Sequence, residues 1–115
     1  MDELVAKIVA ATGVDAGVAR RAAALILGFL LRAGDAGKVR LLVDALPGAN
    51  EAIAANPGSG GSGVMSVFND LTAAGLGMGE IQGVAKAFVR YAREKAGAAA
   101  VDQIVASVPG LSQFM

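Results

Sequence analysis

The chain has no cysteine, no histidine and no tryptophan among its 115 residues. Without cysteine it can form neither a disulfide nor a thiolate nucleophile, and without histidine it lacks the commonest general base and the commonest metal ligand. Aromatic residues are also scarce, with one tyrosine and four phenylalanines. We therefore expect no enzyme active site, no bound metal and no cofactor.

The chain also has no excess of charge of either sign, because ten lysines and arginines balance ten acidic residues. A neutral protein has no long-range field that would concentrate nucleic acid around it, so we expect no nucleic-acid partner. The acidic residues are scattered and follow no calcium-loop spacing. Two carboxylates that folding brings together at a cleft are the one arrangement that would still make this chain an enzyme.

Small apolar residues are what the chain has in quantity. Hydrophobic residues make up 55% of it and charged residues 17%, against about 45–50% and about 25% in ordinary globular domains. The longest apolar run, residues 22–31, would span about 15 Å as a helix, half of a bilayer's hydrocarbon core, and therefore predicts a buried helix and not a membrane span. Asp2 and Glu3 stand where a secretory signal carries positive charge, so we expect a cytoplasmic location.

Helical spacing of the apolar residues, interrupted by glycine and proline, predicts an all-α protein, a compact bundle of about six to eight helices. Gly13 is placed to end the first helix in a left-handed cap, and Asp15 to cap the start of the second. The first expected helix ends at residue 12. The other expected helices cover residues 16–32, 36–45, 48–55, 64–74, 78–96 and 98–107. The last residues, 111–115, are too few for more than one turn.

An internal repeat organises these helices. Residues 33–48 resemble residues 96–110, an alignment that pairs Leu42 with Ile104 and predicts that both are buried. The chain is then one domain, residues 1–115, made of two similar half-repeats (1–55 and 64–115) and a Gly/Ser-rich connector (56–63).

The two long helices of the repeat differ. The first is apolar on every side, which is typical of a helix buried on every side, by the chain itself or by a second subunit. Gly28 interrupts it at a cost of about 1 kcal/mol relative to alanine, which suggests a close backbone approach there. We therefore take Leu27, Gly28 and Leu31 as the candidate interaction surface.

The second long helix is amphipathic, and Lys86, Arg90 and Arg93 follow one another at helical spacing on it. Such a stripe could bind an anion. The plainer interpretation is a solvated helix face, since Glu94 dilutes the positive charge.

A family resemblance rests on the same glycine and proline positions. The segment Ala-Ala-Thr-Gly-Val at 10–14, the long Ala/Leu-rich helix, Leu-Pro-Gly at 46–48, the Gly-rich connector and the segment 71–76 ahead of the second long helix resemble the VcgC/VcgE family of small bacterial proteins of unknown function. The resemblance implies a bacterial, all-helical protein. It assigns no activity and no functional residue.

The leading hypothesis from the sequence is a non-enzymatic helical module that associates with itself, as a homodimer, or with another protein. The alternative is a carrier of an apolar small molecule or lipid, bound between the half-repeats. The aromatic and leucine side chains expected to line such a cavity are Leu27, Phe29, Leu31, Phe68 and Phe88.

Overall fold

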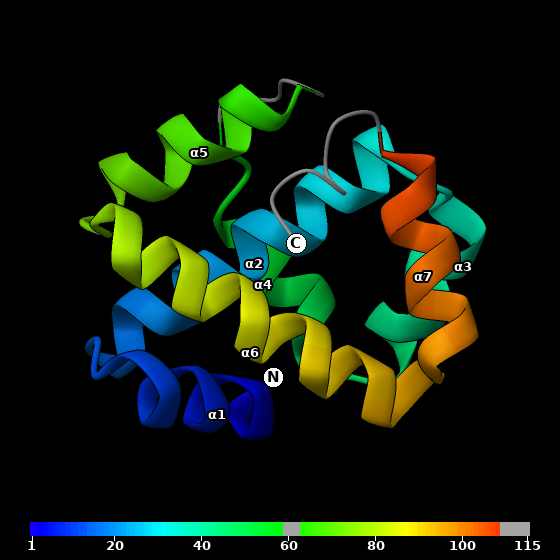
Figure 1. Cartoon of the computed structure of the whole chain (residues 1–115), viewed down its shortest axis with the longest axis horizontal. Coiled ribbons are helices and arrows are strands. Elements are labelled where there is room, and N and C mark those ends of the chain that lie inside the picture. Colours follow the sequence, from blue (N-terminus) through cyan, green and yellow to red (C-terminus); the bar gives the residue numbers. More distant parts are fainter. Residues whose placement is uncertain (59–62, 109–115) are drawn as a thin grey trace.

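The computed structural model describes residues 1–58 and 63–108, and within them it contains seven α-helices and no strand. The helices are α1 (Asp2–Thr12), α2 (Ala16–Ala33), α3 (Ala36–Asp44), α4 (Ala49–Ala55), α5 (Val64–Ala73), α6 (Met78–Ala96) and α7 (Ala98–Ser107) (Figure 1). The prediction of an all-α bundle is confirmed. The predicted short turn at 111–115 and the centre of the predicted connector, 59–62, lie outside the described residues.

Side-chain and glycine caps define the helix ends where the sequence predicted them. Gly13 ends α1 with a left-handed φ of 75°, and the Asp15 carboxylate accepts a hydrogen bond of 2.9 Å from the Gly17 amide at the start of α2. Glu80 in the first turn of α6 accepts a bond of 2.8 Å from the Gly77 amide. The fourth helix begins one residue later than expected, because Gly48 has a φ of 86° and therefore caps the helix instead of joining it.

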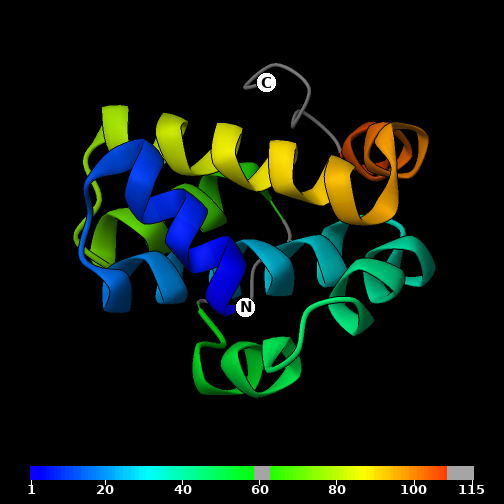
Figure 2. The same ribbon diagram turned by 90° about the horizontal axis from the view of Figure 1, so that it is seen from below.

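The helix α2 is central to the fold. It packs against α1, α3, α4, α5 and α6, and Figure 2 shows it between α6 on one side and α4 on the other. Leu27 and Phe29 are completely or almost completely buried. Helices of the same chain bury most of its apolar residues, whereas Ile26 and Leu31 are only half-buried, so the expectation of burial on all sides is met only in part. Among the described helices, none combines the length and the hydropathy needed to cross a bilayer.

The amphipathic helix α6 lies across the bundle in Figure 1, with α1 alongside it and α7 after it in the chain. Its apolar stripe, which includes Ile81, Val84 and Phe88, is buried, while Lys86 and Arg90 are exposed. The side chain of Thr12 from α1 approaches Gly83 closely. The predicted surface position of this helix is confirmed.

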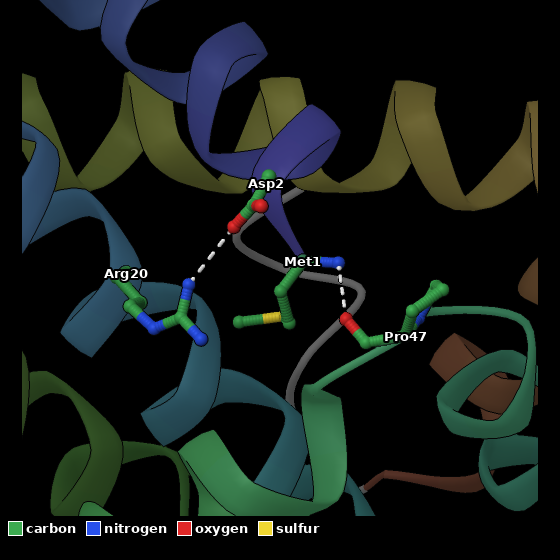
Figure 3. Close-up of polar contacts among 4 residues, drawn as sticks. All are labelled: Met1, Asp2, Arg20 and Pro47. Carbon is green, nitrogen blue, oxygen red and sulfur yellow. Dashed lines mark hydrogen bonds and ion pairs between the residues drawn. The ribbon is translucent and has the colours of Figure 1, made fainter.

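Contacts at the start of the chain join α1 to two other elements (Figure 3). The Met1 amine donates a hydrogen bond of 3.0 Å to the Pro47 carbonyl, next to α4, and the Met1 side chain is buried. Arg20 of α2 pairs with the Asp2 carboxylate at 3.1 Å. Because this ion pair is exposed, it stabilises the fold by at most about 1 kcal/mol.

Two pairs of positions from the repeat alignment are buried: Leu42 and Ile104 are 2% and 3% exposed, and Leu46 and Val108 are both 2% exposed. A short, a long and a short helix also occur in the same order before and after the connector. Burial is shared by every core position, however, so it does not by itself establish a structural repeat. The two half-repeats stay a prediction.

Candidate functional site

An apolar pocket lies among α2, α3, α5, α6 and α7, with a volume of about 90 Å³. Every described residue that lines it is apolar: Ile26, Phe29, Leu30, Leu42, Val64, Val67, Phe68, Leu71, Ile81, Ala85, Phe88, Val89, Ala92, Val101, Ile104 and Val105. Helices α2 and α3, from the first predicted half-repeat, supply one wall. Helices α5, α6 and α7, from the second predicted half-repeat, supply the others.

Helical periodicity explains how each element contributes to the walls. Residues spaced by three and four positions share one face of a helix, and the lining residues of each helix follow this spacing. They are Val64, Val67, Phe68 and Leu71 of α5; Ile81, Ala85, Phe88, Val89 and Ala92 of α6; and Val101, Ile104 and Val105 of α7. The apolar face of each helix thus faces the pocket, and alanines at two of the α6 positions leave space between larger side chains.

The pocket is partly open to the surface. Most of its lining residues, such as Phe29 and Ile104, are buried, whereas Ile26, Phe68 and Val89 are only half-buried. The half-buried lining residues come from α2, α5, α6 and α7. A ligand could therefore bury one end in the pocket while the rest of it stays outside.

A second, shallower recess on the outer face of α6 adjoins the pocket. Two residues, Ala85 and Val89, line both. The remaining described lining residues of this recess are polar or charged: Gln82, Lys86, Arg90, Arg93 and Glu94. We call Lys86, Arg90 and Arg93 the basic rim.

Ion pairs neutralise part of the charge at this recess. Arg93 pairs with Asp102 of α7 at 2.9 Å, and Glu94 lies 3.9 Å from the Lys7 ammonium of α1. Lys86 and Arg90 form no hydrogen bond or ion pair with any described residue. The recess therefore presents two cations without an anionic partner in the described part of the chain.

The apolar walls of the pocket can remove an apolar group from water. Its described walls carry no group that could exchange a proton or act as a nucleophile. Within residues 1–58 and 63–108, no three acidic side chains gather where they could hold a metal ion. The pocket is also smaller than the cavity of roughly 150 Å³ that binds benzene in an engineered core, so it fits the end of a hydrocarbon chain better than a whole lipid.

Two of the three residues of the candidate interaction surface named from the sequence are buried by this chain. Leu27 is 0% exposed, Gly28 is buried and Leu31 is half-buried. A Cβ atom added to Gly28 would lie 3.6 Å from Ile53 of α4 and 3.5 Å from the Arg32 side chain, which are ordinary contacts. The expected close backbone approach at Gly28 is therefore not found, since side chains and not a neighbouring backbone face this glycine.

The structure places the other residues named from the sequence as follows. Phe29, Phe68 and Phe88 line the pocket, whereas Leu27 and Leu31 do not. The three residues of the basic rim are exposed on α6, as their spacing predicted. Sequence reasoning missed the aliphatic walls from α5 and α7 and the position of the basic rim beside the pocket. Their helical stripes were visible in the sequence, but a stripe does not tell where packing leaves space.

The single tyrosine lies outside the pocket, on α6. Tyr91 is buried, and the Lys95 ammonium lies 5.5 Å from the centre of its ring. Burial raises the pKa of the Tyr91 hydroxyl and the negative charge of Glu3 raises it further, while Lys95 acts in the opposite direction. This cluster connects α1 with α6 and so helps to hold the helix that carries the basic rim.

Comparison of the chain with models of protein families, with curated proteins and with solved structures found no match. The resemblance to the VcgC/VcgE family stays a prediction from the sequence. The function therefore has to be inferred from the geometry of the pocket and the basic rim.

Proposed function

We propose that this protein binds the apolar part of a small molecule in the pocket among α2, α3, α5, α6 and α7. The observation that supports this proposal is that every described residue lining this partly open pocket is apolar. Ligand sites are commonly concave and lined by hydrophobic side chains from several elements. Of the two hypotheses raised from the sequence, the geometry favours the carrier of an apolar ligand.

The energetics of an empty pocket support the same proposal. The walls of an unfilled apolar pocket lack the dispersion contacts that a filled core would make, which lowers the free energy of unfolding. A hydrocarbon group that fills it recovers the missing dispersion contacts and removes its own apolar surface from water, at about 0.8 kcal/mol per methylene group. The pocket is thus a cost to the fold that an apolar ligand offsets.

The proposal can be tested by methyl NMR with octanol as the probe. Octanol should shift the methyl signals of the pocket residues Ile26, Leu42 and Ile104 in a saturable way. The methyl signal of Ile8 is the internal control, because this residue is buried, as Leu42 and Ile104 are, but does not line the pocket.

A pair of variants makes the test specific. The Ala85→Leu substitution adds side-chain volume at the pocket and should weaken octanol binding at least severalfold. The Ala106→Leu substitution adds the same volume at an exposed position of α7 that does not line the pocket, and should leave binding unchanged. Equal affinities of the two variants, or shifts spread evenly over Ile8 and the pocket residues, would contradict the proposal.

Self-association is a second candidate function, and the exposed hydrophobic side chains favour it. Leu41, Met65 and Met78 are 66%, 66% and 67% exposed, on α3, α5 and α6. Burying such side chains against a second copy or another protein would remove apolar surface from water. Sedimentation equilibrium at tens of micromolar tests it: a homodimer mass is expected, and a strictly monomeric species would count against it.

A further inference from the structure

We propose that the ligand is a single-chain anionic amphiphile, a free fatty acid, whose hydrocarbon end occupies the pocket and whose carboxylate lies at Lys86 and Arg90. This inference rests on the proposed function, because it requires that the pocket takes up an apolar group. It adds the chemical class of the ligand and assigns a role to the basic rim.

The apolar pocket and the recess that carries the basic rim are continuous. Ala85 and Val89 line both the apolar pocket and the recess that carries the basic rim. Lys86 and Arg90 each follow directly after one of these two residues, one helical turn apart on α6. Lys86 and Arg90 point about 100° away from them around the helix axis, but they line the same recess, so a hydrocarbon chain that leaves the pocket over Ala85 and Val89 enters the recess that the two cations line.

The second argument is the local balance of charge. The Arg93 and Glu94 charges at the recess are each paired, with Asp102 and Lys7. Lys86 and Arg90 have no such partner among the described residues, and Gln82 beside them is uncharged. Two like charges four residues apart on a helix repel each other, and an anion placed between them converts this repulsion into attraction.

The third argument concerns the size of the ligand. A pocket of about 90 Å³ has room for the end of one hydrocarbon chain and not for the two chains of a phospholipid. Lys86 and Arg90 have long side chains that can lie along apolar surface while their charged ends stay in water. Both can therefore donate hydrogen bonds to one carboxylate at the mouth of the pocket.

The test compares octanoate with octanol, which have chains of equal length and differ in the charge of the head group. Calorimetric titration at neutral pH and low salt should give an octanoate affinity about three to ten times that of octanol, the range between an exposed ion pair and a charge-assisted hydrogen bond. Added salt should weaken the binding of octanoate and leave that of octanol unchanged, because salt screens only the charged contact.

Two double variants locate the contact. The Lys86→Gln, Arg90→Gln variant should bind octanoate as weakly as octanol. The Arg21→Gln, Lys38→Gln variant loses the same net charge at positions that line neither recess, and should keep the preference for octanoate.

The outcomes separate this inference from the proposed function. If octanol binds as tightly as octanoate, or if the two double variants behave alike, the anionic ligand is wrong while the apolar pocket stands. If neither compound binds, both proposals fail. If octanoate does not bind but the protein sediments with phosphatidylglycerol vesicles through Lys86 and Arg90, a membrane lipid is the ligand and the inference of a free fatty acid is overturned.

Discussion

Two glycines in the long helices predict opposite effects of the same substitution. A Cβ atom added to Gly83 of α6 would lie 2.7 Å from Cγ2 of Thr12 in α1, closer than real Cβ contacts come. A Cβ atom added to Gly28 of α2 would meet its nearest neighbours, Arg32 and Ile53, at 3.5 and 3.6 Å. Gly83 is therefore a point of close helix packing, and Gly28 is not.

Thr12 cannot easily move away from an added methyl group. Its hydroxyl donates a hydrogen bond of 2.7 Å to the Ile8 carbonyl and accepts one of 3.3 Å from the Val14 amide. A β-branched side chain in a helix also has few alternative rotamers. Relief of the contact at Gly83 thus requires either the loss of these hydrogen bonds or the separation of α1 from α6.

The expected magnitudes follow from two opposing contributions. Replacing a helical glycine by alanine gains up to about 1 kcal/mol, whereas overpacking a close contact costs about 1–3 kcal/mol. Gly28→Ala should therefore raise the free energy of unfolding by up to about 1 kcal/mol. Gly83→Ala should leave it unchanged or lower it by up to about 2 kcal/mol, so the two variants should differ by about 1–3 kcal/mol.

Urea unfolding followed by far-ultraviolet circular dichroism measures this difference. The Thr12→Ser substitution provides the matched control, because it keeps the hydroxyl and removes the methyl group that blocks Gly83. In the Thr12→Ser background, Gly83→Ala should regain the stability that it loses in the parent chain, a coupling that a double-mutant cycle detects. If Gly83→Ala is as stable as Gly28→Ala in the parent chain, the close packing of α1 on α6 is refuted.

Three further predictions follow from the structure. Burial raises the pKa of Tyr91 above 10.0 in the folded state, so near pH 10 the unfolded chain binds fewer protons and the free energy of unfolding should fall as the pH rises further. The contribution of Tyr91 to this fall should be lost in the Tyr91→Phe variant, and an ordinary midpoint in an absorbance titration of the native protein would contradict the raised pKa. The Asp35 carboxylate caps α3 by accepting hydrogen bonds from the Gly37 and Lys38 amides, so Asp35→Ala should lower the free energy of unfolding, measured in urea titrations, by about 1 kcal/mol. A loss no larger than that of the exposed control Asp44→Ala would show that the cap contributes nothing. Leu42→Ala and Ile104→Ala each truncate a buried wall of the pocket and should cost roughly 2–4 kcal/mol in the same titrations; a cost below that of an ordinary surface substitution at either position would contradict its burial.

Local signals made most of the secondary structure predictable. Both ends of α6 and the start of α7 were predicted at the observed residues, because Gly77 and Gly97 interrupt the helical pattern there, and the end of α7 was predicted from Pro109. The caps at Gly13 and Asp15 follow from the conformational freedom of glycine and from the hydrogen-bonding capacity of an aspartate at a helix start. Such signals act within a few residues and need no knowledge of the tertiary fold.

The candidate site was less predictable, since it depends on contacts between helices that are distant in sequence. Phe29, Phe68 and Phe88 were expected at a cavity, but any apolar residue of these helices could have faced the core. Leu27 is on the same helix as Phe29 and yet lies outside the pocket, because its direction around the helix axis differs. The space beside Ala85 arises only from the way in which α5 and α6 pack on α2, and α7 packs on α6 and α3.

We expect a hydrocarbon chain to enter the pocket among α2, α3, α5, α6 and α7. Intermolecular nuclear Overhauser effects between bound octanol and the protein test it most directly, because they report direct contact. We expect Overhauser effects from the octanol chain to the methyl groups of Ile26 and Ile104 and none to Ile8. Effects that reach only exposed side chains such as Met65 and Met78, or no effect at a concentration that saturates the shifts, would contradict it.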